Sequence, residues 1–77
     1  MARQRLVEYH LGRLKDKRAE VRIEAINELL QLDAVEALDT LQELYRNDPD
    51  AEVKKAAQSA GRTLFLKSRQ QSSESQA

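Results

Sequence analysis

Apolar residues along this chain recur three and four positions apart, and no stretch alternates apolar and polar residues with a period of two. The spacing of three and four places such side chains on one face of an α-helix, whereas a half-buried strand would require the alternation. The pattern therefore predicts an all-α protein with four helices, at about residues 3–15, 17–32, 34–46 and 49–67.

Helix-capping residues stand near the start of three of these segments. Asp48 offers a side-chain acceptor at the N-cap of the fourth helix, and Pro49 suits its first helical position. Asp33 has Glu36 three residues on, which predicts a capping box at the start of the third helix. Asp16 is interpreted in the same way, as the cap of the second helix.

The last ten residues, SRQQSSESQA, have no apolar periodicity and are rich in Ser and Gln. A segment of this composition has too little apolar surface to bury to offset the entropy of ordering it. The sequence therefore predicts one domain over residues 1–67 and a disordered tail over residues 68–77.

The chain contains an internal repeat. A shift of 32 places aligns DKRAEVRIEA, which begins at Asp16, with DPDAEVKKAA, which begins at Asp48. The preceding helices align with a shift of 30, which superposes Leu11 on Leu41. A period of this length made of two helices is typical of an α-solenoid. We therefore expect repeat 1 at about residues 3–32 and repeat 2 at about residues 34–67.

These repeats resemble the HEAT repeat family, most closely the short HEAT-like repeats of phycobilisome lyases. That family's pattern is Leu-x-Asp, then Val-Arg-x-x-Ala and a closing Leu, and the matching residues in repeat 1 are Leu14, Asp16, Val21, Arg22, Ala25 and Leu29. Repeat 2 matches at Asp48, Pro49, Val53 and Ala57, with Lys54 in place of the arginine and Gly61 where leucine is common. The resemblance covers about residues 3–67. It implies an α-α superhelix of two helical hairpins, in which Arg22 and Lys54 occupy a position that often braces adjacent repeats. Since such repeats serve as scaffolds in unrelated roles, the resemblance leaves the function open.

Equivalent positions in the two repeats differ in polarity. Residues Ile23, Ile26 and Leu30 correspond to Lys55, Gln58 and Arg62, whereas Glu24 and Glu28 correspond to Ala56 and Ala60. In the first helix of each repeat, Leu6 and His10 correspond to Glu36 and Thr40, and Glu8 and Lys15 to Leu38 and Tyr45. We interpret each repeat as apolar toward the other and polar toward the outside, as terminal repeats are. This predicts a complete two-repeat domain. Because three repeats are usually required for stability, we expect this domain to be either marginally stable or supported by self-association or a partner.

The charge of the chain is zero overall but is divided unevenly. Residues 1–23 carry a net charge of +4, residues 24–52 of −8 and residues 53–77 of +4. We interpret these blocks as solvated helix faces that attract their neighbours in the fold. The chain has no cysteine, no apolar run of about 20 residues and no apolar signal-peptide core. These features predict a cytoplasmic protein with no membrane segment.

The sequence predicts no catalytic, metal or cofactor site. It contains one histidine and no Gly-rich phosphate loop. We expect His10 to have a structural role on the apolar side that meets repeat 2, because catalysis needs a positioned set of groups. Glu24 and Glu28 are interpreted as solvated surface, and Gly12 and Gly61 as positions of close helix packing.

Three function classes remain. The favoured class is a small non-catalytic adaptor that binds an unidentified protein partner through a shallow face lined by the second and fourth helices. A weak homo-oligomer is a further expectation, with no surface assigned to it. The candidate binding residues on that face are Asn27, Gln31, Ser59, Arg62 and Leu66.

The two alternatives carry less weight. One is nucleic-acid binding through basic residues near both ends, namely Arg3, Arg5, Arg13, Lys15, Lys17, Arg18, Lys55, Arg62, Lys67 and Arg69. Three aromatic residues, the absence of a reading motif and the acidic middle argue against it. The other is an accessory subunit related to phycobilisome lyase or chaperone systems, for which two repeats would enclose only a small cavity.

Overall fold

The computed structural model describes the backbone of residues 2–76 and the side chains of residues 2–70. The elements are α1 (Ala2–Arg13), α2 (Ala19–Gln31), a short 3-10 helix η1 (Val35–Ala37), α3 (Leu38–Asn47) and α4 (Ala51–Gln76). The predicted all-α class with four helices is confirmed over this part of the chain. The third predicted helix begins with the separate 3-10 turn η1. None of the described helices is long and apolar enough to cross a membrane.

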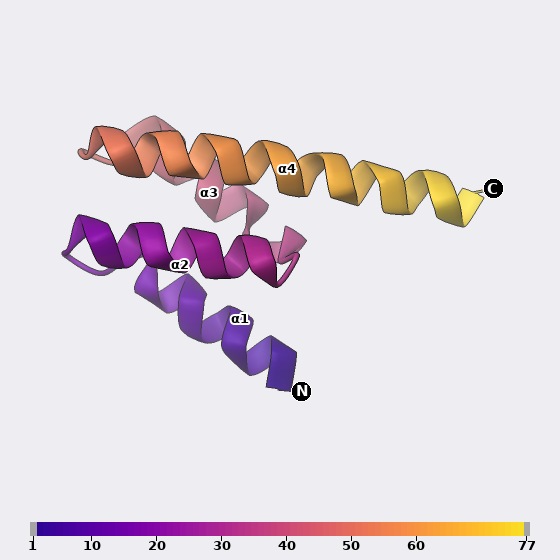
Figure 1. Ribbon diagram of the computed structural model, residues 1–77, viewed down its shortest axis with the longest axis horizontal. Helices are drawn as coiled ribbons and strands as arrows, with labels where there is room; N and C mark the ends of the chain where they lie inside the picture. Colours follow the sequence, from indigo (N-terminus) through magenta and orange to yellow (C-terminus); the bar gives the residue numbers. More distant parts are fainter. Residues whose placement is uncertain (1, 77) are drawn as a thin grey trace.

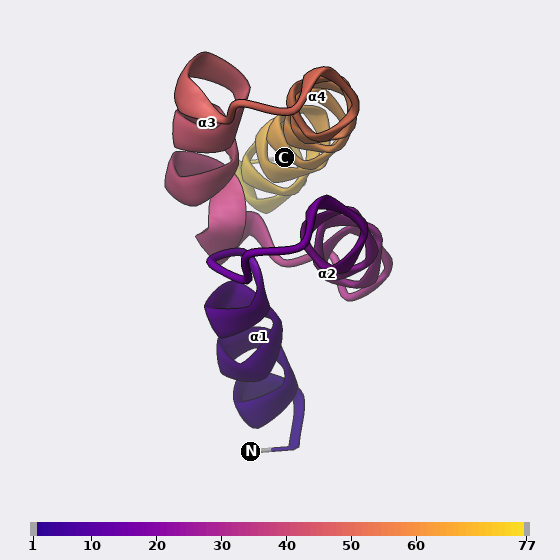
Figure 2. The same cartoon turned by 90° about the vertical axis from the view of Figure 1, so that its left-hand side faces the viewer.

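The helices form two layers, with α1 and α3 in one and α2 and α4 in the other (Figure 2). In Figure 1, α2 and α4 run side by side in the same direction, and α3 lies behind α4. Helix α4 packs against both α2 and α3, and α1 packs mainly against α2. This arrangement is the predicted superhelix of two helical hairpins, in which α2 and α4 form the junction between repeats.

The hydrophobic core follows the helical period and is rich in small side chains. On α4 the buried residues are Val53, Ala57, Ala60 and Leu64, which recur at the spacing of one helix face. From α2 they meet Ala25, Ile26 and Leu29, all fully buried. The remaining buried apolar residues are Val7, Leu14, Ala34, Ala37 and Leu41. The buried alanines lie on α2, η1 and α4 and in the loop before η1, among leucine, isoleucine and valine side chains.

Asp33 ends α2 instead of capping the third helix, so the predicted capping box is wrong. Its φ of 52° is left-handed, a conformation in which Asp is enriched among non-glycine residues. The N–H of Asp33 donates to Leu30 O and that of Ala34 to Leu29 O, both at 3.0 Å, which is the Schellman pattern of a helix C-terminus. Glu36 is not free to cap, because its carboxylate binds Arg3.

The start of α4 also differs from the prediction. Asp50 is the cap, since its Oδ1 accepts the N–H groups of Glu52 at 2.8 Å and Val53 at 3.0 Å. Asp48 lies two residues earlier, where its Oδ1 accepts the N–H of Asp50 at 2.9 Å. At α2 the same geometry recurs, because Asp16 Oδ1 accepts the N–H of Arg18 at 2.9 Å and no side chain caps the helix itself. Both predicted caps are therefore wrong by two residues, and Asp48 becomes available for another contact.

The backbone of α4 continues as helix to Gln76, beyond the predicted end near Lys67. Two contacts mark its later turns: Lys67 Nζ forms an ion pair with Asp33, and the Arg69 guanidinium lies 5.9 Å from the Phe65 ring centre. The predicted tail, residues 68–77, falls mostly on residues 71–77, whose side chains lie outside the described part.

Candidate interaction surfaces

A buried ion pair between Arg22 and Asp48 braces the two repeats. Arg22 donates from Nε to Asp48 Oδ2 at 2.8 Å and from Nη2 to Asp48 Oδ1 at 3.0 Å. Its Nη1 donates to the backbone oxygens of Asp16 at 2.8 Å and Lys17 at 3.0 Å. The side chains of Arg22 and Asp48 are only 11% and 3% exposed. A bidentate, nearly dry pair of this kind has strong geometric specificity, and it is the bracing role that the family resemblance implied for Arg22.

The equivalents of this pair lie at the two ends of the molecule. Asp16 is the equivalent of Asp48, and it binds Arg18 two residues on, with Arg18 Nε 3.1 Å from Asp16 Oδ1. The hydrogen bonds from Arg18 hold the pKa of the Asp16 carboxyl below its usual value. Lys54, the equivalent of Arg22, forms no ion pair with any described residue. An ion pair between repeats thus forms once, at the junction. At the two ends, Asp16 and Lys54 have no such pair with another repeat.

The predicted junction is confirmed for α2 and α4. Ile26 and Ala60 are buried, and Ile23, Leu30 and Ala56 pack half-buried against the core. Their outward equivalents on α4, namely Lys55, Gln58 and Arg62, are exposed.

The same prediction is wrong for α1 and α3. Leu6 is 47% exposed and Tyr45 is 44% exposed, although both were expected to face the other repeat. Because α1 and α3 pack mainly on the α2 and α4 layer instead of on each other, the sides that carry these residues turn toward the two ends. Each end is therefore polar along α2 or α4 and partly apolar along α1 or α3.

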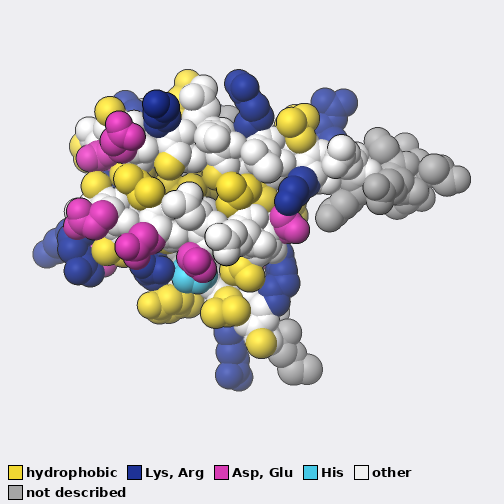
Figure 3. Space-filling model, in the orientation of Figure 1, with side chains coloured by type: hydrophobic (Ala, Val, Ile, Leu, Met, Phe, Trp, Pro, Cys, Tyr) yellow, Lys and Arg dark blue, Asp and Glu magenta, His cyan; other side chains and the backbone are white. Residues whose placement is uncertain are grey.

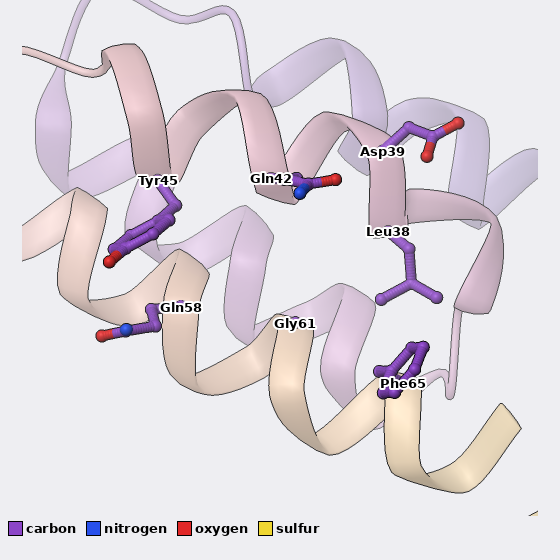
Figure 4. A pocket seen from close by; sticks show the side chains of 7 residues that line it. All are labelled: Leu38, Asp39, Gln42, Tyr45, Gln58, Gly61 and Phe65. Carbon is purple, nitrogen blue, oxygen red and sulfur yellow. The ribbon is translucent and has the colours of Figure 1, made fainter. Parts of the chain in front are cut away.

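A groove of ≈ 460 Å³ opens at the end formed by repeat 2, between α3 and α4. Its lining residues are Leu38, Asp39, Gln42, Tyr45, Gln58, Gly61 and Phe65. In Figure 4, the Tyr45 and Phe65 rings lie toward opposite ends of the groove, with Gly61 between them. The equivalent of Gly61 in repeat 1 is Leu29, which is fully buried. The groove therefore exists where repeat 2 lacks a large side chain, and helix packing does not require this glycine, because an added Cβ would meet only Leu41 Cβ at 4.0 Å. At Gly12 an added Cβ would meet nothing within 4 Å, so the close packing expected there is also absent.

A second hollow of ≈ 410 Å³ lies at the other end, between α1 and α2, and is lined by His10, Arg13, Glu24, Asn27 and Glu28. Arg13 connects its walls, because Nη2 lies 2.9 Å from Glu24 Oε1 and Nη1 donates to His10 Nδ1 at 3.2 Å. His10 is thus buried at the outer end of repeat 1, not at the junction where it was expected. The Tyr9 ring lies edge-on to the His10 ring, with 5.0 Å between the two ring centres. Among the described residues, no three His, Cys, Asp or Glu side chains are grouped so as to hold a metal ion.

The five predicted binding residues are all exposed. Asn27 lines the hollow between α1 and α2, whereas Ser59 and Arg62 line another hollow on α4 together with Lys55, Gln58 and Thr63. Gln31 and Leu66 lie on the same two helices, α2 and α4. The five residues therefore lie in one layer of the fold, two on α2 and three on α4. They do not line a common hollow.

Charged side chains are segregated across this layer. In Figure 3, acidic side chains gather along α2 and basic ones along the outer edge of α4. Near the start of α1, Arg3 Nη1 lies 2.8 Å from Glu36 Oε2, and this hydrogen bond is the main reason that the pKa of Glu36 is below its usual value. Several basic residues are therefore already paired within the fold, whereas Lys55 and Arg62 on α4 are exposed and form no ion pair with any described residue.

Residues 1–61 match the family of HEAT repeats. A search of curated proteins and a search of solved structures each gave no match, and the finer likeness to phycobilisome lyases stays a prediction. The match covers the first hairpin, the Arg22–Asp48 brace and the second hairpin as far as Gly61, and the chain belongs to the HEAT repeat family.

Proposed function

We propose that this chain is a small, non-catalytic adaptor of the cytoplasm that binds a protein partner through the outer face of α2 and α4. The observation that carries the proposal is the exposure of Leu66, which is 53% exposed on the solvent side of α4. HEAT repeats generally mediate protein–protein interaction, and this chain belongs to that family.

The α2 and α4 face is open to a partner. These helices form one layer, and within residues 2–76 no other helix covers its outer side (Figures 1 and 2). Leu66 and Arg62 lie one turn apart on α4, with Ser59 a further turn away. An apolar side chain beside an arginine is the combination that protein interfaces use as an anchor, and Asn27 and Gln31 on α2 would extend the contact with polar groups.

Nucleic-acid binding is the weaker alternative, because much of the basic charge is compensated within the fold. Arg3, Arg13 and Arg18 each pair with a carboxylate, as does Lys67. If the chain nevertheless bound nucleic acid, its affinity would fall steeply with salt and would drop further on replacing Arg3, Arg5 and Arg13 by Gln. A role as an accessory subunit of a lyase or chaperone system has no observation of its own in this structure.

A matched pair of variants tests the binding face. The first, Ser59→Asp with Leu66→Asp, adds two charges on the solvent side of α4. The second, Gln42→Asp with Phe65→Asp, adds the same two charges in the groove between α3 and α4. All four residues are exposed, so both proteins should keep the helical circular-dichroism spectrum and the melting midpoint of the parent.

We expect proteins captured from native extract by the parent chain to be lost with the first variant and retained with the second. Nuclease treatment of the extract should leave the capture unchanged. Equal capture by both variants would show that the partner site lies elsewhere. Capture that disappears with nuclease would favour the nucleic-acid alternative.

A further inference from the structure

The two ends of the molecule carry complementary surfaces. At the outer end of repeat 1, Glu24 and Glu28 form an acidic stripe one turn apart on α2. Glu24 is paired with Arg13, whereas Glu28 forms no ion pair with any described residue. At the outer end of repeat 2, Lys55 and Arg62 lie with Gln58 on one side of α4, where Figure 3 shows basic side chains along the edge. The charges of the two stripes are therefore opposite in sign.

The internal repeat relates these stripes to the junction that already exists. Inside the molecule, the Ile23, Ile26 and Leu30 side of α2 packs against the side of α4 that carries Ala56 and Ala60. If a second molecule continued the superhelix, the α2 side of this contact would be replaced by its α4 equivalents, Lys55, Gln58 and Arg62. The α4 side would be replaced by its α2 equivalents, Glu24 and Glu28 of the second molecule. The position of an apolar contact within the chain thus becomes the position of a salt-bridged contact between chains.

The brace has the same relation. Within the chain, Arg22 on α2 binds Asp48 in the loop before α4. One repeat along, Lys54 on α4 would meet Asp16 in the loop before α2 of a second copy. Asp16 already has the backbone geometry of Asp48, since each accepts the N–H two residues on at 2.9 Å. Among the described residues, the Asp16 carboxylate forms an ion pair only with the exposed Arg18, and Lys54 forms none.

The apolar parts of the two ends also match in character. The groove between α3 and α4 exposes the Tyr45 and Phe65 rings, and the end of repeat 1 exposes Leu6 and Tyr9 on α1. Exposed apolar side chains rimmed by charge are typical of an interaction site. Both ends therefore have the two components, apolar and ionic, that a repeat junction needs.

We infer that the chain associates with itself head to tail, so that the groove end of one copy binds the α1 and α2 end of the next and continues the superhelix. This goes beyond partner binding by the outer face of α2 and α4. A symmetric contact between two groove ends is disfavoured, because it would place Lys55 and Arg62 of one copy near the same basic residues of the other, and like charges across an interface are costly. A head-to-tail contact does not close on itself, so assembly continues past the dimer.

Sedimentation equilibrium of the full chain tests this inference. The weight-average mass of the parent should rise with concentration, up to about 1 mM, from the monomer value of 8.8 kDa past twice that value. Two charge variants identify the contact. The first is Glu24→Lys with Glu28→Lys, and the second is Lys55→Glu with Arg62→Glu.

Each charge variant alone should remain monomeric, because its two ends then carry the same sign, whereas an equimolar mixture of the two should associate again. Circular dichroism checks that both remain helical. A further variant, Lys54→Arg, should raise the mass at a given concentration, because arginine can bind the Asp16 carboxylate with two hydrogen bonds.

Three outcomes would overturn the inference. The parent could stay at the monomer mass over the whole range, the Glu24→Lys, Glu28→Lys variant could associate as the parent does, or the mixture could remain monomeric. Association by that variant would indicate the symmetric contact instead. An unchanged mass for Lys54→Arg would show that residue 54 does not contact Asp16 of the next copy.

Discussion

The junction between the repeats and the groove end of repeat 2 are made of equivalent positions with different residues. At the junction, Arg22 binds Asp48, and Ile26 and Leu29 are fully buried. At the groove end, the equivalents are Lys54, Gln58 and Gly61. The junction residues form a buried contact, whereas their equivalents at the groove end leave a polar surface with a groove. Both sets occupy the same positions on equivalent helices.

This difference shows how a repeat is made internal or terminal. Burial of an isoleucine and a leucine contributes several kcal/mol at the junction, and the bidentate ion pair fixes how the two hairpins sit. At the groove end, Gly61 stands in place of Leu29 and Lys54 in place of Arg22. Both contributions are therefore missing there, although the helix itself is kept.

The largest effect is expected for Ile26→Asp, which places an unpaired charge in the fully buried junction. Burying such a charge costs several kcal/mol, and a domain of this size has only a few kcal/mol of net stability. We expect the variant to be unfolded by circular dichroism at 25 °C. Its matched control is Gln58→Asp, the same change at the exposed equivalent, which should melt close to the parent. Equal loss of helix in both variants would break the comparison.

Arg22→Ala should be the next most destabilising change, because it leaves the Asp48 carboxylate buried without its partner. Removing one member of a buried pair costs about 3–5 kcal/mol. The control Lys54→Ala removes the half-buried equivalent and should change the free energy of unfolding by less than about 0.5 kcal/mol. Chemical denaturation of both variants in a stabilising osmolyte, which favours the folded state, measures the difference in free energy of unfolding, and comparable values would mean that the Arg22–Asp48 pair does not stabilise the junction.

Gly61→Ala should stabilise the protein. The added Cβ meets only Leu41 Cβ at 4.0 Å, an ordinary contact distance, and alanine in a helix interior is more favourable than glycine by about 0.5–1 kcal/mol. We expect the melting midpoint to rise by a few degrees. A fall in the midpoint would show that the groove end depends on glycine for packing, as the junction depends on Leu29.

The smallest effect concerns pH. Hydrogen bonds from Arg18 and Arg3 lower the pKa values of Asp16 and Glu36 in the folded state. A lowered carboxyl pKa stabilises the fold above the unfolded value, about 3.9 for Asp and 4.3 for Glu, and this contribution is lost as the pH falls through the folded pKa. The melting midpoint should therefore be flat near neutrality and fall below about pH 4, and Glu36→Gln should reduce that fall slightly because the pair is exposed. A midpoint in the variant that depends on pH as the parent does would exclude the Arg3–Glu36 pair as a source.

The helices, the repeat and the α2–α4 junction could be predicted from the sequence because each depends on periodic spacing or on comparison of equivalent residues. Ile26 and Ala60 are buried as their pattern predicted. Cap positions were missed because Asp16, Asp33, Asp48 and Asp50 are all suited to helix ends, and the backbone decides which of them acts. Asp33 adopts a left-handed conformation that its sequence neighbours do not reveal.

The interaction surfaces were predicted less well. Leu38 and Tyr45 are less polar than their equivalents in repeat 1, Glu8 and Lys15, and the sequence shows this difference. It does not show toward which end of the molecule Leu38 and Tyr45 point, because that depends on how α1 and α3 cross the layer of α2 and α4. The signal for the groove was present in the sequence, since Gly61 stands where repeat 1 has Leu29. Its meaning required the structure, where the neighbours of Gly61 are partly exposed rings.

A double-mutant cycle at Arg22 and Asp48 tests the central comparison most directly. The free energies of unfolding of the parent, Arg22→Ala, Asp48→Ala and the double variant would be measured by chemical denaturation in a stabilising osmolyte, which keeps the weakened variants folded before denaturant is added. We expect a coupling energy at the upper end of the range for contacting residues, about 2–3 kcal/mol, whereas the equivalent cycle at Lys54 and Asp16 in dilute solution should give about zero. Coupling below about 0.5 kcal/mol at Arg22 and Asp48 would contradict the claim that this pair distinguishes the closed junction from the open end.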